Sequence, residues 1–505
     1  MEDAGPLPEE ATAPPSLVPG LPGLAESLAT VGYSSSGLHA VLGNADLLAT
    51  PADLAIYERR LASAAGPLAD VIALLALGWP RTVEGIVDAL GRSAVDALVA
   101  SGCVIESGND VQPAVRIVPH RGLWLAADRR HDVGTAPDPL QVTGINPPAT
   151  LLAALTVRRP ARRALDVGTG NGIQALLAAR HSGHVVATDV NPRALEFAAF
   201  NAAVNGIDGI EFRSGSLLEP VAGERFDLVV SNPPYVISPE HAFVFRDSGA
   251  APGALCAALV HALPDVLAPG GFATVLASWP VRDAPWDSVP SSWLGDGCRA
   301  WLLQLRSEDP VLHARQWNQP LADAGDVAGF GAAVDRWVRY LAEHHIDQIA
   351  YGAVVLQEHP GAPTVIRSDQ VRAGAGGASA HIERVFAAYS MLRDGAYRGL
   401  ADWTCHVPAE HRMERALHFV DGSWRHGDAL ITLTEGVGIE ATIDPLMSEI
   451  LLRVSSGATV TAAATAVGEQ AGINPEQLDG LVAAAVAMVR ELIATGIVEP
   501  GPAPD

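Results

Sequence analysis

The tetrapeptide Asn232-Pro233-Pro234-Tyr235 places two hydrogen-bond acceptors and an aromatic ring in one rigid turn. The side-chain oxygen of Asn232 and the backbone carbonyl of Pro233 can each accept one hydrogen of a planar NH₂ group. The prolines restrict the backbone and fix the direction of that carbonyl, and the ring of Tyr235 can stack on a flat group. These four residues are therefore predicted to be catalytic. They would orient an amide or aromatic amine, whose delocalised lone pair makes it a poor nucleophile.

A glycine-rich segment, residues 166–172, is the second place where chemistry is expected. Its glycines allow a sharp turn from a strand into a helix and a close approach of the backbone to a ligand. The dinucleotide fingerprint GxGxxG/A does not fit, because Ile173 stands at its last position. The spacing is instead GxGxG, preceded by an acid. We predict that this segment binds a cofactor through Asp166, Gly168, Thr169, Gly170 and Gly172.

Asp189 ends the apolar run that follows this segment. A carboxylate at such a strand end can accept hydrogen bonds from both hydroxyls of a ribose. Asn191 is expected to cap the following helix, which has Pro192 at its first position. The loop formed by Asp189, Val190 and Asn191 is therefore predicted to bind the nucleoside part of the cofactor.

These motifs resemble those of class I methyltransferases that depend on S-adenosylmethionine (SAM). The GxGxG turn behind an acid is the pattern of that class. Asn-Pro-Pro-Tyr after a fourth strand is similar to the amino-methyltransferases: HemK/PrmC-type glutamine methyltransferases of release factors, adenine-N6 DNA methyltransferases, and guanine-N2 rRNA enzymes with a "methyltransferase small" domain. The resemblance covers about residues 140–280, and the turn with Val236 behind it is most similar to the HemK group.

The resemblance implies SAM as the cofactor and gives roles to further residues. Asp166 would position the methionine end of SAM, whose amino group is cationic. Ser216 would accept a hydrogen bond from the adenine amino group, and Leu217 would pack on the face of that ring. Asn232 would lie beside both the cofactor and the methyl acceptor. No strong base is needed, since the proton leaves after the nitrogen has become cationic.

The expected activity is that of an enzyme, a SAM-dependent methyltransferase (EC 2.1.1.-) acting on a planar amino or amide nitrogen. Lys and Arg total 33 against 57 Asp and Glu, a net charge of −24. Because proteins that bind nucleic acid usually show a basic surface, a protein, peptide or small-molecule acceptor is favoured. Three alternatives stay open: methylation of an RNA or DNA base, O- or C-methylation of a secondary metabolite, and SAM binding by a non-catalytic scaffold.

Alternating strands and helices must position these residues. Apolar runs that end in loops predict seven strands: Ala164–Val167, His184–Asp189, Ile210–Arg213, Phe226–Ser231, Phe272–Ser278, Ala300–Leu305 and Gln348–Gln357. Helices between most of them predict an α/β fold with a doubly wound, mostly parallel sheet, the Rossmann-like seven-stranded core of the class I enzymes. An insertion with a helix at Val334–His344 is expected between the last two strands.

Five segments are predicted along the chain. They are a disordered N-terminus at 1–23, a helical plus winged-helix-like domain at 24–125, the methyltransferase domain at 130–366, a Gly-rich linker at 367–380, and a helical C-terminal domain at 381–505 that ends in a second winged-helix-like module. The candidate recognition helix of the first module, Ser93–Val99, has no Lys or Arg. Such a helix is poorly suited to reading DNA bases.

The cysteines and the hydropathy pattern complete the expectations. The four cysteines form no CxxC pair, which is typical of reduced thiols in a cytoplasmic protein. Cys405 and His406, with His411 and His418, lack the paired spacing of zinc ligands, so no metal is expected. No apolar run approaches the ~20 residues of a membrane helix, so no membrane partner is expected.

Overall fold

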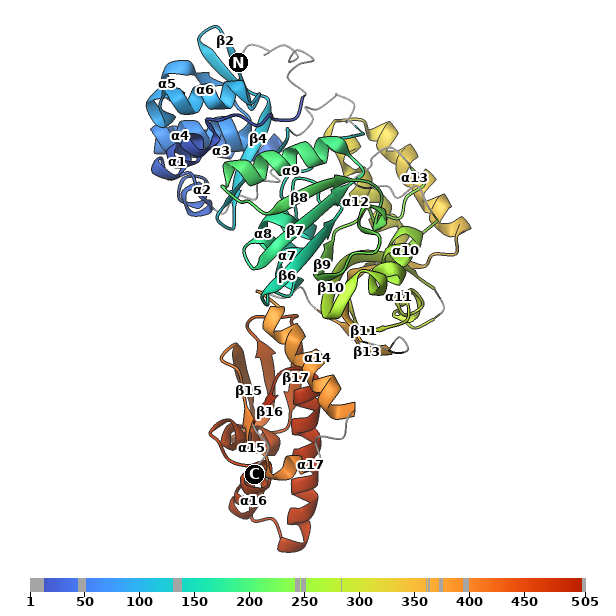
Figure 1. Ribbon diagram of the computed structural model, residues 1–505. Coiled ribbons are helices and arrows are strands. Elements are labelled where there is room, and N and C mark those ends of the chain that lie inside the picture. The colour runs from blue at the N-terminus through green and yellow to red at the C-terminus, as the bar shows by residue number, and fades with distance from the viewer. Residues whose placement is uncertain are drawn as a thin grey trace.

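The central element of the fold is a mixed sheet of eight strands in the order β13-β11-β12-β10-β9-β6-β7-β8 (Figure 1). The computed structural model describes residues 13–43, 51–129, 139–240, 246, 251–282, 284–359, 361, 364–371, 376–393 and 399–501. The strands of this sheet are β6 (Ala161–Val167), β7 (Ser182–Asp189), β8 (Ile210–Ser214), β9 (Phe226–Ser231), β10 (Leu267–Val281), β11 (Cys298–Glu308), β12 (Gln348–Glu358) and β13 (Thr364–Gln370).

Strand direction in the sheet is that of a class I methyltransferase core. Strands β6 to β10 are parallel to one another, and β12 runs antiparallel between β10 and β11. All seven predicted strands are present. β13 is an eighth, parallel to β11, and it includes residues 367–370 of the stretch expected to be a linker. That part of the linker prediction was wrong, because β11 offers an edge on which these residues pair.

Alternate residues of the strands face two helical layers, as the two-residue period of a strand requires. Ala164 and Leu228 pack with α7 and α14 on one face. Leu165 and Val229 pack with α10 on the other. Because both faces are covered, the strands appear in the sequence as continuous apolar runs. The helices of the core are α7 (Pro147–Leu155), α8 (Ile173–Ala179), α9 (Pro192–Val204), α10 (Ala254–Ala262) and α14 (Ser379–Arg393).

The N-terminal region has the helix, strand, helix, helix, hairpin order of a winged helix, with the sheet order β1-β3-β2. Its elements are α1 (Leu21–Thr30), α2 (Ser35–Leu42), α3 (Pro51–Ala64), α4 (Pro67–Val71) with a π-helical turn (Ile72–Leu77), β1 (Arg81–Thr82), α5 (Val83–Leu90), α6 (Arg92–Ala100), β2 (Val104–Ser107), β3 (Asp110–Pro113), β4 (Val115–His120) and β5 (Leu123–Asp128). Disorder was predicted as far as residue 23, but α1 begins at Leu21, because Leu21, Leu24 and Leu28 form a buried stripe. Residues 1–12 lie outside the described residues.

Two asparagines of α9 join this region to the core. The side chain of Asn201 accepts from the Ala126 backbone N–H (2.7 Å) and donates to its carbonyl (3.0 Å). Asn205 does the same at Trp124, at 2.9 and 2.7 Å. The strand that contains both partners, β5, was not predicted, and it extends beyond the expected domain boundary at residue 125. The backbone groups on the outer edge of β5 form hydrogen bonds with the side chains of these two asparagines.

The insertion between β11 and β12 contains two helices, α12 (Pro310–Asp323) and α13 (Val327–Glu343). The predicted helix at Val334–His344 corresponds to the second half of α13, whereas α12 was not predicted. Asp309 begins α12: its carboxylate accepts the backbone N–H groups of Val311 (2.8 Å) and Leu312 (3.0 Å). A short helix, α11 (Ser288–Ser291), lies between β10 and β11.

The C-terminal region contains a sheet that was not predicted. Residues 411–443, expected to be helical, form the antiparallel sheet β15-β16-β17. Only alternate residues at the end of β16 (Ala429, Ile431, Leu433) are buried, and the hairpin tip is exposed on both faces, so the sequence shows little strand periodicity. The elements are β14 (Cys405–His406), β15 (His411–Val420), β16 (Ser423–Leu433), β17 (Glu440–Ile443), α15 (Pro445–Ser455), α16 (Val460–Gln470), α17 (Pro475–Ala494) and β18 (Glu499–Pro500). Figure 1 shows them as a separate lobe next to α14.

Candidate active site

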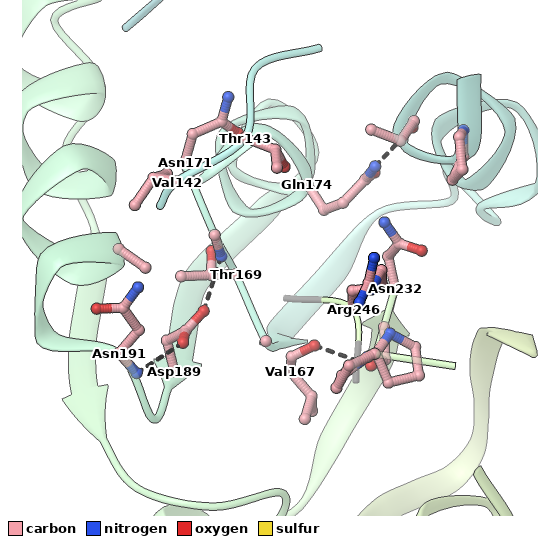
Figure 2. Close-up of a pocket in the computed structure, with 18 of the residues that line it drawn as sticks. Val142, Thr143, Val167, Thr169, Asn171, Gln174, Asp189, Asn191, Asn232 and Arg246 are labelled. Atoms are coloured by element: carbon pink, nitrogen blue, oxygen red, sulfur yellow. Dashed lines mark hydrogen bonds between the residues drawn. The ribbon is translucent and has the colours of Figure 1, made fainter. Parts of the chain in front are cut away.

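A cavity of about 450 Å³ lies at the carboxyl ends of β6, β7, β8 and β9, where open α/β sheets bind their ligands. The predicted site residues that line it are Asp166, Gly168, Thr169, Gly170, Asp189, Val190, Asn191, Ser216, Leu217, Asn232, Pro233, Pro234 and Tyr235. Figure 2 shows Asp189 and Asn191 on one side of the cavity and Asn232 with Arg246 on the other. The tertiary structure thus brings the separate motifs into one site.

The glycine turn after β6 has two different functions. Gly168 (φ +72°) and Gly170 (φ +55°) line the cavity in the left-handed region, and a Cβ on either would meet no protein atom within 4 Å. The turn therefore leaves room for a ligand against its backbone. Gly172, also predicted to bind the cofactor, is not among the residues that line the cavity. A Cβ there would lie 2.9 Å from the Ala198 side chain of α9, so this glycine allows α9 to pack closely.

Asp166 is buried at the end of β6. One carboxylate oxygen accepts the Thr169 hydroxyl (2.7 Å) and the Ala175 backbone N–H (3.0 Å). Burial raises the pKa of Asp166 to about 7, against the lowering effect of these bonds and with a smaller raising effect of Asp189. A cationic ligand group beside it would favour the charged form.

Asp189 connects the glycine turn to the next loop. Its two carboxylate oxygens accept the backbone N–H groups of Gly170 and Asn191, each at 2.9 Å. Burial raises the pKa of this carboxyl. Each oxygen keeps a further lone pair, so the geometry still allows it to accept a pair of ligand hydroxyls. Asn191 in turn caps α9 by accepting the N–H of Arg193 (3.0 Å).

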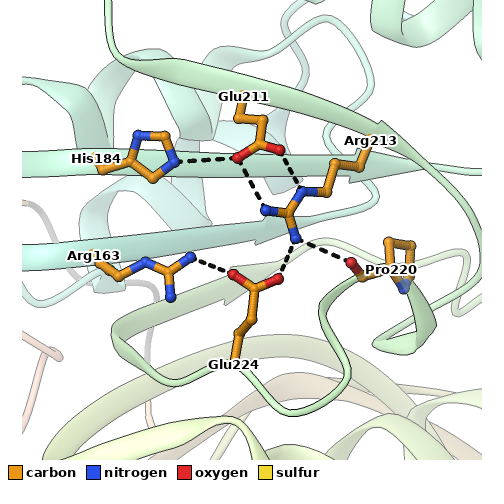
Figure 3. Close-up of polar contacts among 6 residues, drawn as sticks. All are labelled: Arg163, His184, Glu211, Arg213, Pro220 and Glu224. Atoms are coloured by element: carbon orange, nitrogen blue, oxygen red, sulfur yellow. Dashed lines mark hydrogen bonds and ion pairs between the residues drawn. The ribbon is translucent and has the colours of Figure 1, made fainter.

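The loop after β8 presents Ser216 and Leu217 to the cavity. Leu217 has φ +49°, a conformation that costs a non-glycine residue energy and is often found at ligand sites. The Arg213 guanidinium holds this loop by donating to the Pro220 carbonyl (3.0 Å) and to Glu224. Figure 3 shows the surrounding ion pairs, which join β6, β7 and β8.

The Asn232–Tyr235 turn is fixed at both ends. The Ser231 hydroxyl donates to the Val167 carbonyl (2.8 Å), which joins β9 to β6, and the Ser278 hydroxyl donates to the Tyr235 carbonyl. Between these points Asn232 Oδ1 is buried and has no hydrogen-bond partner among the described residues. A buried acceptor of this kind is costly unless a ligand satisfies it, so the site fits a donor NH₂ group.

Several residues of the cavity escaped sequence reasoning. Trp317 comes from α12, which gave no motif, and Gln174 lies on α8 behind the glycine turn. Arg246 is buried in the cavity wall, with its guanidinium 3.8 Å from the Glu240 carboxylate. Asn146 lines the cavity while it caps α7. The part of the chain that the structure describes contains no group of three or more metal-ligating side chains.

Residues 144–278 match the family model described as the methyltransferase small domain. The matched segment is about a quarter of the chain and contains the glycine turn, Asp189 and the Asn232–Tyr235 turn. The match confirms the resemblance found in the sequence, and with it the class I fold and SAM as the cofactor of the domain. Of the helices in the described ranges, none has the length and apolar character needed to span a membrane.

Curated relatives are similar over the same part of the chain. A release factor glutamine methyltransferase of Xylella fastidiosa is 49% identical over 77 residues, 15% of this chain and 28% of the relative. A ribosomal protein L11 methyltransferase of Pelotomaculum thermopropionicum is 50% identical over 76 residues, 15% of this chain and 24% of the relative. The chain thus spans less than a third of the length of these relatives.

The chain was also compared with a solved SAM-dependent methyltransferase from Thiobacillus denitrificans in complex with S-adenosyl-L-homocysteine. The two are 17% identical with a TM-score of 0.25, and the alignment covers 43% of this chain and 94% of the solved one. So low a score supports no conclusion. The fold assignment therefore depends on the strand order and on the family match.

Proposed function

We propose that the protein is an enzyme that transfers a methyl group from SAM to a planar amide or amino nitrogen of a protein, peptide or small molecule. The observation that supports this most directly is the buried, unpartnered Oδ1 of Asn232. It lies in the same cavity as Asp166 and Asp189.

The cofactor end of the cavity would hold SAM by its polar groups. Asp166 would face the cationic amino group, and Asp189 would accept the ribose hydroxyls with the lone pairs that its backbone partners leave. Ser216 and Leu217 would border the adenine. SAM supplies a sulfonium methyl group, which is electrophilic at carbon.

At the acceptor end, Asn232 Oδ1 and the Pro233 carbonyl would accept the two hydrogens of the NH₂ group. This holds the nitrogen lone pair towards the methyl group, and Tyr235 offers a ring to the acceptor plane. Orientation of this kind can lower a barrier by up to ~7–11 kcal/mol in favourable cases. No general base is required, because the nitrogen releases its proton after the N–C bond has formed.

A protein acceptor is the first candidate. Three relatives are named for protein substrates: a release factor glutamine, ribosomal protein L11 and a glutamine of ribosomal protein uL3. The net charge of −24 also opposes binding to nucleic acid.

Incubation of the full chain with methyl-tritiated SAM and a fractionated bacterial lysate tests the proposal. We expect label in a protein fraction, and loss of that label when Asn232 is replaced by Ala. Calorimetry should show that Asn232→Ala still binds SAM. Binding of SAM without label in any fraction would instead establish the scaffold.

A further inference from the structure

Helix α12 lies directly behind the Asn232–Tyr235 turn, although it comes from the insertion between β11 and β12. His313 of α12 is completely buried. Its Nε2 lies 2.8 Å from the Ile237 carbonyl, and its Nδ1 lies 2.5 Å from the Tyr351 hydroxyl. The indole Nε1 of Trp317, one turn further along α12, lies 3.1 Å from the same hydroxyl.

The chemistry of the groups at the two ends determines the direction of this chain of hydrogen bonds. The Ile237 carbonyl can only accept, so His313 must donate from Nε2. The Trp317 indole can only donate, so the Tyr351 oxygen accepts from it. The Glu308 carboxyl also contacts this hydroxyl, but a neutral His313 that donates from Nε2 can only accept at Nδ1, so the Tyr351 O–H 2.5 Å away points to it. A histidine with one donor and one acceptor nitrogen is neutral. Burial lowers the pKa of His313 to about 4, which agrees with a neutral ring at neutral pH.

Ring contacts add to the hydrogen bonds. The Tyr351 ring meets Tyr235 edge to face, with centroids 6.4 Å apart and an interplanar angle of 76°. Arg306 covers Tyr351 at 4.1 Å from the ring centroid. Val236 packs with Trp337 of α13. The insertion therefore determines where the backbone leaves the turn.

Trp317 distinguishes this arrangement from an ordinary buried histidine. Its indole nitrogen belongs to the chain of hydrogen bonds, and its side chain also lines the cavity that contains Asn232. The wall of the acceptor end and the support of the turn are thus parts of one network.

Charges along the cavity wall limit the acceptor. Among the described residues that line it, the carboxylates are Asp166 and Asp189, and both lie at the cofactor end. Among the described lining residues the cationic one is Arg246, which Figure 2 shows on the same side of the cavity as Asn232. The carboxylate that pairs with Arg246, Glu240 at 3.8 Å, is not among the lining residues. Among the described residues of the wall, a protonated amine at the acceptor end would therefore meet a guanidinium and no carboxylate, whereas an uncharged planar group meets no such repulsion.

We propose that α12 is the acceptor-recognition element of this site: Trp317 forms the wall against which an uncharged, planar acceptor group lies, and Tyr351 and His313 are positioning residues that hold Trp317 and the end of the Asn232–Tyr235 turn in register. This inference depends on the proposed function, because it assigns the acceptor end of the same cavity.

Two pairs of variants in the full chain test it, with the labelled lysate fraction as acceptor. Trp317→Ala should raise the KM for this fraction about tenfold, the loss of roughly 1.4 kcal/mol of ring contact, and leave the Kd for SAM unchanged. Trp424→Ala, which removes an exposed indole from β16, is the control and should change neither. An unchanged KM for Trp317→Ala would overturn the assignment of the wall.

Tyr351→Phe removes only the hydroxyl and should lower kcat about tenfold while SAM still binds. Tyr33→Phe is its matched control, because the buried Tyr33 hydroxyl donates to the Ile117 carbonyl (2.6 Å) in the N-terminal region. It should cost comparable thermal stability and leave kcat unchanged. Equal effects of the two variants on kcat would reduce Tyr351 to a structural residue and overturn its positioning role.

Two further measurements do not depend on these variants. Nitrogen-15 NMR of histidine, with His313 assigned by its loss in His313→Gln, should show the neutral tautomer protonated at Nε2 at pH 7. A proton on Nδ1 would overturn the positioning network. Amino-acid analysis of the labelled product should show no methylated lysine or arginine, because either would contradict an uncharged acceptor.

The proposed function and this inference fail in different ways. If the wild-type chain labels no fraction, the proposed function fails, and the inference fails with it. If the wild type labels a fraction and Trp317→Ala does so with the same KM, only the inference fails.

Discussion

The cofactor end and the acceptor end of the cavity are built in different ways. At the cofactor end, Asp166 accepts hydrogen bonds from Thr169 and Ala175, and Asp189 accepts them from Gly170 and Asn191. At the acceptor end, Asn232 Oδ1 has no partner among the described residues, and its surroundings come from α12 and β12. The two carboxylates of the first end have hydrogen-bond partners without a ligand, whereas the acceptor oxygen of the second end is left for the ligand to satisfy. Mutations at the two ends should therefore separate binding from transfer.

Asn232→Ala should have the largest effect. It removes one of two acceptors that orient the nucleophile, and we expect the transfer rate to fall by roughly 10²–10³, the range measured when one orienting hydrogen-bond group is removed from other enzymes. The Kd for SAM should change less than about twofold, because Asp166 and Asp189 remain. Single-turnover transfer and calorimetry measure the two quantities. A large loss of SAM binding would remove the distinction between the two ends.

Asp189→Ala should show the opposite pattern. The carboxylate holds Gly170 and Asn191 and would accept two ribose hydroxyls, so its loss should weaken SAM binding about 10–100-fold, or ~1.4–2.8 kcal/mol. At saturating SAM, transfer should recover most of the wild-type rate. A rate that stays low at saturation would mean that Asp189 also serves the acceptor.

Asp166 makes the cofactor end sensitive to pH. Its folded pKa of about 7 lies above the ordinary value of 3.8, so its ionisation works against folding. The contribution of Asp166 to the free energy of unfolding is therefore fully present below pH 4 and is lost as the pH rises towards and through 7. Asp166→Asn should therefore raise the Tm of the ligand-free protein at pH 8, by about 2–4 °C for each kcal/mol recovered, and not at pH 4.

SAM affinity should follow the opposite trend. A cationic ligand favours the ionised Asp166, so the wild-type affinity should rise between pH 6 and pH 8, and this rise should be absent in Asp166→Asn. Calorimetry at several pH values measures it. A pH-independent wild-type affinity would mean that Asp166 does not face a cation.

The smallest effects concern the glycines of the turn. A Cβ at Gly168 would project into open space in the cavity, so Gly168→Ala should reduce SAM affinity. A Cβ at Gly172 would meet Ala198, so Gly172→Ala should lower Tm and have less effect on affinity. Both substitutions also cost about 1 kcal/mol of backbone strain, because they place an alanine at a positive φ. Since this cost is common to the two variants, each variant is the control for the other. Thermal denaturation with and without SAM separates the two effects.

Much of the cofactor end could be predicted from the sequence because its parts are short and local. A strand, a glycine turn and a helix must follow one another within a few residues for Asp166 to accept the N–H of Ala175, and that requirement appears directly as spacing. The same local logic identified Asn191 as a helix cap. It gave no sign of the close contact between Gly172 and Ala198, because that constraint comes from α9.

The regions that were missed depend on contacts between distant parts of the chain. β13 was missed and pairs with β11, and β14 was missed and pairs with the end of the chain at β18. The hairpin of β15 and β16 is exposed on both faces near its tip, so it lacks the alternation that marks a half-buried strand. β5 has its edge satisfied by two asparagine side chains of α9. None of these partners is visible from local composition.

The amino-acid sequence by itself determined where the seven predicted strands lie along the chain, that Asp166 and Asp189 stand at strand ends, and that Asn232–Tyr235 forms a turn. Each of these features depends on residues that are neighbours in the chain. Only the tertiary structure decided that Trp317, Tyr351 and His313 stand behind that turn, since they come from a helix and a strand far along the sequence. The spacing of residues in the sequence predicts those parts of a site that a single segment forms. The parts that several segments form together depend on how those segments pack, which the sequence does not show directly.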